Sequence, residues 1–360
     1  MYLSESNFPL LKKLTIIIPT YQRQAFALRC MQYWSGKSVT IIMLDGSKNS
    51  LGSDSLSKLK SNIKYIHNPV SLYERMFSAT SLIDTEYSIL GSDDEFYIPS
   101  ALNSCLICLS TNPELVSCTG RAFGFEWNGE SVNAWDIYPE IKNLNLSNSN
   151  PTSRIDKHFT NYVCAHIYGV CRSSVWKVAI EATFAKEYSW FAAGEVQIEF
   201  LLVFAGKTKS IPEIMWMRSK ESIPHRNDSP SHFPEHRPEI WWYEKKNEIE
   251  REDLISRMEL ACKEMNKLTN KHHVPNVRVL FETFIKYQRI SIFFLTFARL
   301  PFIIRNMIKK FLKIFGYEFI KKRLLEDYIQ LLKSTGVKAD LNELQKIEKI
   351  ITTHYKKNQL

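Results

Sequence analysis

Hydrophobic runs alternate with polar turns and helical repeats over roughly the first third of the chain. Continuous apolar runs rich in Ile, Leu and Val are typical of buried strands in a mostly parallel sheet, and they lie at 14–19, 39–44, 63–66, 87–90 and 115–118. Between these runs, apolar residues recur at helical spacing over 25–34, 53–60, 72–83 and 99–112. This alternation of strands and helices predicts a doubly wound, Rossmann-like α/β sheet.

The later part of the chain predicts fewer strands and, after residue 240, only helices. Residues 121–150 combine an aromatic stretch with a polar, Asn- and Ser-rich loop, and 222–238 indicate a second loop or linker. Strands are predicted over 166–170 and 210–217, and helices over 154–162, 174–182 and 195–205. We therefore divide the chain into an α/β domain over 1–240 and a helical C-terminal region over 241–360.

Polar clusters follow three of the predicted strands, at 20–23, 45–47 and 92–94. Sheets of this kind bind ligands beyond the carboxyl ends of their strands, so the three clusters are expected to share one cleft. Adjacent carboxylates such as Asp93 and Asp94 are costly unless a positive charge neutralises them. A divalent ion that bridges a diphosphate would supply that charge, and oxygen ligands suit Mn²⁺ or Mg²⁺. A solvated acidic turn before a helix is the alternative.

The first two clusters suit a nucleotide. Arg23, in the turn after the first strand, is expected near a phosphate group, and Asp45 is expected to accept a hydrogen bond from the base or ribose. Ordinary turn chemistry is the alternative for both segments, because Asp-Gly is a common turn pair.

The order and spacing of these segments resemble the family 2-like glycosyltransferases of GT-A fold over residues 14–217. The matching segments are Thr-Ile-Ile-Ile-Pro-Thr-Tyr-Gln-Arg at 15–23, Leu-Asp-Gly-Ser at 44–47 and Gly-Ser-Asp-Asp-Glu-Phe-Tyr-Ile-Pro at 91–99. The resemblance implies transfer of a sugar from a nucleotide-sugar donor to a glycan or lipid-linked acceptor, by a GT-A domain with a helical C-terminal appendage. The donor contacts that it implies are Pro19, Thr20, Tyr21, Arg23, Asp45, Ser92 and Asp94.

The resemblance also implies a metal site for Mn²⁺ or Mg²⁺. The metal ligand of the family falls on Asp93, while Gly91 stands where the family has another Asp, so Asp94 is expected to replace part of that function. His225 follows the strand predicted over 210–217 and matches a further metal ligand of many GT-A enzymes. His232 and His236 are nearby alternatives, as is a solvated loop histidine.

The catalytic carboxylate implied by the resemblance is Glu195, which opens a helix that ends at Gly206. An inverting transferase needs a general base to take the proton of the acceptor hydroxyl. Glu199 lies one turn further along the same helix face and is the second candidate. A carboxylate that only stabilises the helix N-terminus is the alternative for Glu195.

A net charge of +9 suits nucleic acid, anionic lipid or a phosphate-bearing substrate. Residues 288–323 mix Phe, Ile and Leu with Lys and Arg, which predicts an amphipathic stretch for an anionic membrane surface. A helix that packs on the catalytic domain or on a second subunit is the alternative. Residues 326–355 predict polar-faced helices that suit a homo-oligomer.

The seven irregularly spaced cysteines predict free thiols and a reducing compartment. No secretory signal is recognised and no apolar run reaches the length of a membrane span, so we expect a cytoplasmic protein, peripheral to the inner face of the cell membrane. Two other classes are considered: a nucleotidyltransferase acting on sugar phosphates, and a non-catalytic membrane- or nucleic-acid-binding protein. The segment 20–23 lacks the Gly-rich loop of the first class, and no nucleic-acid motif supports nucleic acid as a partner.

Overall fold

One mixed sheet organises the chain. The computed structural model describes residues 8–190, 192–220, 238–288, 304, 307 and 321–358. Within them the sheet has ten strands, with the order β10-β7-β6-β8-β4-β1-β2-β3, and β9 pairs with both β5 and β6. The strands are β1 (Leu14–Thr20), β2 (Thr40–Asp45), β3 (Ile63–His67), β4 (Tyr87–Leu90), β5 (Phe96–Tyr97), β6 (Leu115–Trp127), β7 (Val132–Asp136), β8 (Val170–Arg172), β9 (Lys207–Ser219) and β10 (Arg323–Leu324).

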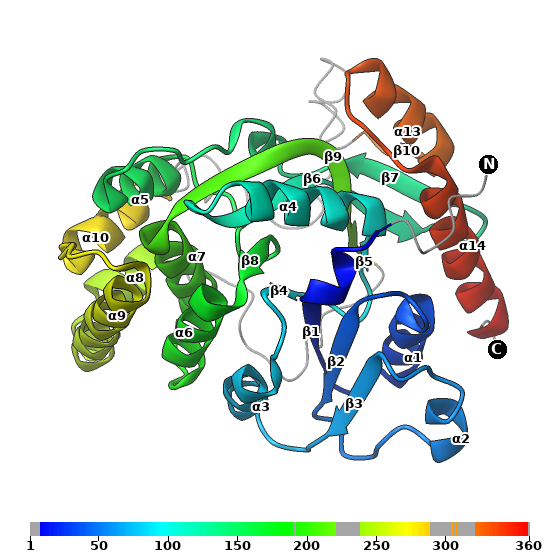
Figure 1. Cartoon of the computed structure of the whole chain (residues 1–360), viewed down its shortest axis with the longest axis horizontal. Helices are drawn as coiled ribbons and strands as arrows, with labels where there is room; N and C mark the ends of the chain where they lie inside the picture. The colour runs from blue at the N-terminus through cyan, green and yellow to red at the C-terminus, as the bar shows by residue number, and fades with distance from the viewer. Residues whose placement is uncertain are drawn as a thin grey trace.

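Helices cover both faces of this sheet (Figure 1). They are α1 (Gln24–Trp34), α2 (Ser53–Leu56), α3 (Leu72–Ala79), α4 (Pro99–Thr111), α5 (Pro151–Thr160), α6 (Ser173–Phe184), α7 (Ala193–Ala205), α8 (Pro238–Tyr243), α9 (Glu248–Thr269), α10 (Val277–Tyr287), α13 (Leu325–Ser334) and α14 (Leu341–Asn358). The predicted α/β architecture with a helical C-terminal part is confirmed.

The parallel strands β1, β2, β3 and β4 form the part of the sheet that the sequence predicts best. Strand β1 pairs in parallel with β2 and β4, and β2 pairs in parallel with β3. Successive residues of β1 enter different cores: Ile16 and Ile18 pack beside α1 and α4, and Ile17 packs on the other face. Each fully buried Ile contributes about 1.5–3 kcal/mol, which explains why the apolar run is continuous.

The segment between α5 and α6 departs from the prediction. The strand expected over 166–170 is wrong, because β8 begins only at Val170. The backbone N–H of Ile167 donates to the side chain of Glu199 at 2.8 Å. The N–H of Gly169 turns back to the carbonyl of His166 at 3.0 Å. These bonds occupy donors that a strand would offer to its neighbour. Conversely, the region 121–150 contains half of β6 and all of β7.

The helices after residue 240 pack at two different ends of the sheet (Figure 1). Helices α9 and α10 contact α5, α6 and α7, whereas α13 contacts β7 and α14 contacts α1 and β7. Strand β10 also pairs with β7. The domain division at residue 240 stays a prediction, and most of the basic stretch over 288–323 lies outside the described residues.

All seven cysteines are free thiols, as predicted. Among the helices that the structure describes, none combines the length and the apolarity needed to cross a bilayer.

Candidate functional site

The acidic segment that follows β4 lies at the carboxyl edge of the parallel strands. The N–H of Gly91 donates to the carbonyl of Ile17 at 2.8 Å and so continues the pairing of β4 with β1. A Cβ atom at Gly91 would lie 3.0 Å from side-chain carbons of both Ile16 and Ile18. The position that carries an Asp in the resembling family therefore has little room here for any side chain.

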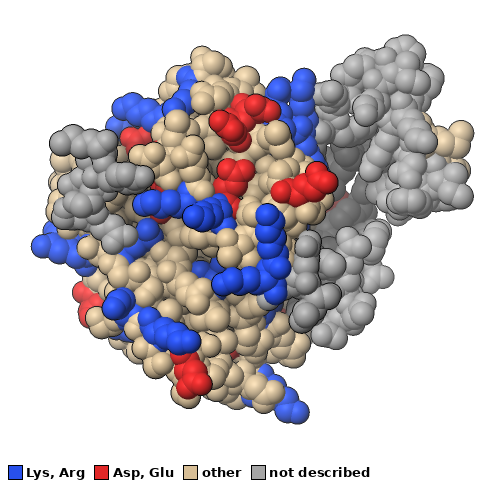
Figure 2. All heavy atoms as spheres, turned by 90° about the vertical axis from the view of Figure 1, so that its right-hand side faces the viewer, with Lys and Arg blue, Asp and Glu red and all other residues tan. Residues whose placement is uncertain are grey.

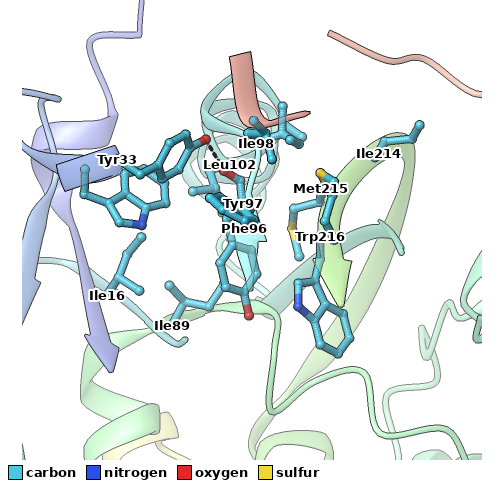
Figure 3. Packing of buried hydrophobic residues seen from close by; sticks show 14 of the residues in the cluster. Ile16, Tyr33, Ile89, Phe96, Tyr97, Ile98, Leu102, Ile214, Met215 and Trp216 are labelled. Atoms are coloured by element: carbon cyan, nitrogen blue, oxygen red, sulfur yellow. Dashed lines mark hydrogen bonds between the residues drawn. The ribbon is translucent and has the colours of Figure 1, made fainter. Parts of the chain in front are cut away.

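Buried aromatic residues pack next to this acidic segment. Strand β5 follows it directly and pairs antiparallel with β9, Tyr97 opposite Trp216. The hydroxyl of Tyr33, on α1, donates to the carbonyl of Tyr97 at 2.8 Å, and Figure 3 shows this bond amid the packed side chains of Phe96, Ile98 and their neighbours. The position of the acidic segment is thus fixed by the core rather than by the loop itself.

Arg23 forms ion pairs with both Asp93 and Asp94. Its Nη2 atom lies 3.2 Å from Oδ1 of Asp93 and 2.7 Å from Oδ2 of Asp94. Thr20 donates to Oδ2 of Asp93 at 2.6 Å, and Ser92 donates to Oδ1 of Asp94 at 2.6 Å. Arg23 therefore joins the two aspartates directly, and Thr20 and Ser92 each bind one of them.

The electrostatics of the pair are only partly balanced. The two aspartates are 2% and 4% exposed. Burial raises the pKa of Asp93 to about 6, against the lowering effect of Arg23. Burial acts to lower the pKa of Arg23, but the charges of Asp93 and Asp94 outweigh it and raise that pKa. Arg29 lies beside the pair as well: it donates to the carbonyl of Asp94 at 3.0 Å, and its charge also lowers the pKa of Asp93, so two arginines together offset part of the effect of burial.

Asp45 lies beside this pair, because it is in register with Thr20 on the neighbouring strand. It is fully buried, and its two oxygens accept bonds from the N–H of Ser47 at 2.8 Å and the hydroxyl of Tyr65 at 2.6 Å. In this arrangement Asp45 positions the turn that follows β2. Its predicted contact with a base or ribose stays a prediction.

A second arginine, which the sequence did not identify, lies under this turn. Arg75 of α3 donates from Nη1 to the carbonyl of Thr20 at 2.8 Å. A Cβ atom at Gly46 would lie 2.4 Å from the guanidinium carbon of Arg75, so any other residue at position 46 would displace this guanidinium group. No local pattern around residue 75 signals this role, since the contact joins segments that are far apart in the sequence.

The turn after β1 presents its side chains outward. Gln22 has a φ of 53°, a left-handed conformation that is uncommon outside glycine, and its N–H donates to the hydroxyl of Ser47 at 2.7 Å. Tyr21 is 48% exposed, and Pro19 is partly buried at the end of β1. The exposed ring of Tyr21 is therefore free to stack on a ligand.

Glu95 extends the acidic segment toward β9. Its Oε2 atom accepts from the indole N–H of Trp216 at 2.6 Å, and Tyr168 stacks on Trp216 at 4.4 Å between ring centroids. Burial, together with the charge of Asp94, raises the pKa of Glu95 to about 8. Glu95 therefore holds a proton at neutral pH, and it was not among the predicted site residues.

The carboxyl of Glu195 lies at the start of α7 and is partly buried. Its Oε1 atom accepts from the hydroxyl of Tyr162 at 2.6 Å. Among the described residues no bond engages its second oxygen. Burial raises the pKa of Glu195, and the bond from Tyr162 opposes this rise. A partly buried carboxylate with one oxygen left open suits proton abstraction.

Glu199 lies deeper and is fully buried. It accepts bonds from His158 at 2.9 Å and from the N–H of Ile167 at 2.8 Å. Burial raises the pKa of Glu199 to about 7, while burial lowers that of His158 to about 3. Glu199 therefore anchors the loop before β8, and an acceptor cannot reach it without rearrangement.

The pKa of Tyr168 responds to carboxyls from two parts of the chain. Burial raises its pKa well above the usual range, and the charges of Glu95, Glu195 and Glu199 raise it further. Carboxyls from β4–β5 and from α7 thus act on one side chain. Asp45 and Asp93 are thus joined through Thr20, whereas Glu195 is related to them only through its electrostatic effect on Tyr168.

Two sets of residues bear on a metal ion. Asp93 and Asp94 offer the oxygen ligands that Mn²⁺ and Mg²⁺ prefer, and in this structure both carboxylates pair with Arg23. Within the described residues one group of three, His158, His166 and Glu199, has ligand atoms within 4.8 Å of one another. His225, His232 and His236 lie outside the described residues.

Comparisons with known proteins give structural likeness only. No protein-family model and no curated sequence matches the chain. The structure is similar to that of S. aureus TarS 1-349, with 9% identity, a TM-score of 0.42, and coverage of 77% of this chain and 89% of that chain. TarS 1-349 in complex with UDP-GlcNAc gives 10% identity, the same coverage and a TM-score of 0.43. A longer TarS structure gives 11% identity and a TM-score of 0.41, covering 71% of this chain and 44% of that one.

Proposed function

We propose that the chain is a glycosyltransferase that moves a sugar from a nucleotide-sugar donor to an acceptor hydroxyl. One observation supports this most: buried carboxylates and an arginine from distant segments meet at the carboxyl edge of parallel strands. The carboxyl of Glu195 acts on the same Tyr168 as Glu95 beside that edge. Sheets of this kind bind their ligands at such edges.

The donor nucleotide is assigned to the turns after β1 and β2. Tyr21 is exposed enough to stack on a base, and the turn held by Asp45 lies next to it. Arg23 is placed to exchange its bonds with Asp93 and Asp94 for bonds with the donor diphosphate. Guanidinium groups bind phosphate through paired hydrogen bonds, which favours this exchange.

Asp93 and Asp94 would hold a Mn²⁺ or Mg²⁺ ion once Arg23 has shifted toward the diphosphate. Such an ion, when bound, offsets the charge on the departing nucleoside diphosphate. The side chains of the protein position the ligands: Thr20 and Ser92 orient the two carboxylates, and Arg23 binds phosphate oxygens.

Glu195 is proposed as the general base rather than Glu199, because its second oxygen is open while Glu199 is enclosed. It takes the proton of the acceptor hydroxyl as that oxygen bonds to the anomeric carbon of the sugar. The bond from that carbon to the diphosphate breaks, and the electron pair leaves with the nucleoside diphosphate. Attack opposite the leaving group inverts the anomeric centre.

The acceptor is proposed to be a glycan or a lipid-linked molecule in the cytoplasm. An anionic membrane surface and a homo-oligomer are kept as proposals from the sequence, because the basic stretch that suggests the membrane lies mostly outside the described residues.

A thermal-shift panel of nucleotides and nucleotide sugars, with and without Mn²⁺, tests the proposal. We expect one or two nucleotides to raise the melting temperature in wild-type protein, with a Mn²⁺-dependent part that Asp93→Asn removes. Asp327→Asn, an exposed change on α13, is the matched control and should behave as wild type. If no nucleotide or nucleotide sugar stabilises the wild-type protein, the proposed function is wrong.

A further inference from the structure

A groove lies between α1 and α14, next to the turn that follows β1. Its lining residues on α14 follow helical spacing, from Lys346 through Lys349 and Ile350 to Lys357, so they share one face of the helix. Leu28 and Arg29 of α1 face them across the groove. The cavity volume is about 630 Å³, within the range of sites for small ligands.

The lining of the groove is cationic. Four of its lining residues are Lys or Arg, and none is Asp or Glu: Arg29, Lys346, Lys349 and Lys357. Glu343 pairs with Lys346 at 3.4 Å but does not line the groove. Among the described residues Lys349 and Lys357 have no ion-pair partner, and both are exposed. Figure 2 looks onto this end of the molecule, where Lys and Arg side chains cross the middle of the face.

Part of the lining of the groove is apolar. Ala25, Leu28 and Ile350 contribute apolar side chains to the lining, which also includes Gln32 and Thr353. Burial, reinforced by the nearby Arg29, lowers the pKa of His354 to about 4, so this lining histidine is neutral. A ligand that fits this groove therefore combines a negatively charged group with a part that can pack on apolar side chains. A phosphate-bearing sugar or lipid intermediate has both.

Arg29 joins the groove to the acidic segment. It lines the groove, and its Nη2 atom donates to the carbonyl of Asp94 at 3.0 Å. The ring of Phe26 lies between two guanidinium groups, 5.0 Å from that of Arg23 and 4.9 Å from that of Arg29. A molecule bound in the groove therefore lies one side chain away from the residues proposed to hold the donor diphosphate.

We infer that the groove between α1 and α14 binds the phosphate-bearing part of the acceptor as a single molecule. A groove between two helices can enclose one ligand molecule, whereas a flat bilayer surface would contact only the residues at the edge of the groove. The assignment of this ligand as the acceptor rests on the proposed glycosyltransferase function, whereas the binding of phosphate in the groove does not.

Titration calorimetry with inorganic tripolyphosphate tests the site directly. The double variant Lys349→Gln/Lys357→Gln should bind roughly ten-fold more weakly than wild type, because two cation–phosphate contacts are lost. The control Lys333→Gln/Lys356→Gln removes the same charge from exposed positions outside the groove, and should stay within about two-fold of wild type. Equal weakening in both variants would assign the binding to overall charge and overturn the inference.

Two further experiments distinguish the groove from the donor site, and a single phosphate-bearing molecule from a membrane surface. Titrating Lys349→Gln/Lys357→Gln with a nucleoside diphosphate should give the same affinity at the donor site as wild type, and a ten-fold loss there would contradict a separate site. Vesicles with phosphatidylglycerol should bind both double variants alike, while a loss confined to the groove variant would assign the groove to the membrane and refute single-molecule binding. The groove titration remains readable even if no nucleotide binds, so the failure of one proposal leaves the other testable.

Discussion

Removing the hydroxyl of Tyr162 should shift the pH dependence of transfer. In the structure this hydroxyl donates to Oε1 of Glu195 at 2.6 Å, and the bond lowers the pKa of that carboxyl against the effect of burial. In Tyr162→Phe the ring remains packed on Phe284, 4.9 Å away between centroids, but the carboxylate loses its donor. The pKa of Glu195 then rises, and the base is ionised only at higher pH.

The size of the shift follows from the strength of the lost bond. A hydrogen bond to a charged group contributes about 1.5–3 kcal/mol. Since 1.36 kcal/mol corresponds to one pH unit, the acid limb of the kcat/KM profile should move upward by roughly one to two pH units. The plateau at high pH should approach that of wild type, because Glu195 is still present and becomes ionised there.

The assay is the pH profile of kcat/KM for wild type, Tyr162→Phe and a matched control. Tyr188→Phe is that control: it removes another tyrosine–carboxylate bond, 2.7 Å from Tyr188 to Asp253, on the helical side of the molecule. Its acid limb should coincide with that of wild type. A profile of Tyr162→Phe that falls uniformly at every pH, with no movement of the limb, would refute the assignment of Glu195 as the base.

Three further predictions concern the residues around the site. Arg23→Gln removes the ion pairs with Asp93 and Asp94 but leaves Arg29 beside them, and should lower the free energy of unfolding by about 1.5–3 kcal/mol in urea titrations near pH 8; an unchanged midpoint would contradict the ion pair. The pKa of Glu199 is about 7 in the folded protein, against an ordinary value of 4.5, so between these pH values Glu199 binds a proton only in the folded state. The free energy of unfolding should therefore fall as pH rises through this window, and Glu199→Gln should flatten that trend in urea titrations. Gly91→Ala should destabilise the fold by roughly 1–3 kcal/mol, because its Cβ would clash with two isoleucine side chains. An unchanged melting temperature in calorimetry would contradict this clash.

The parallel half of the sheet could be predicted from the sequence, because its signal is local. Residues buried on both faces produce continuous apolar runs, and each run ends at a polar turn. The cluster of Thr20, Arg23, Asp93 and Asp94 follows from the same rule, since parallel strands bring their carboxyl ends to one edge. Their chemical roles stay predictions until donor binding is measured.

The contacts that hold the site are long-range, and the sequence does not reveal them. The bonds of Arg75 to β1, of Tyr65 to Asp45 and of Trp216 to Glu95 join segments with no shared local pattern. The strand predicted over 166–170 failed for a related reason. Its apolar run is typical of a strand, but the buried Glu199 binds its backbone instead.

The most direct test of the central claim is the identity of the phosphate product. The nucleotide sugar selected by the binding panel is incubated with glycan acceptors and followed by phosphorus NMR, using wild type and Glu195→Gln. We predict nucleoside diphosphate and a glycosylated acceptor from wild type, with donor binding intact and the rate at least about 100-fold lower in Glu195→Gln. Release of pyrophosphate, or full activity in Glu195→Gln, would contradict the account.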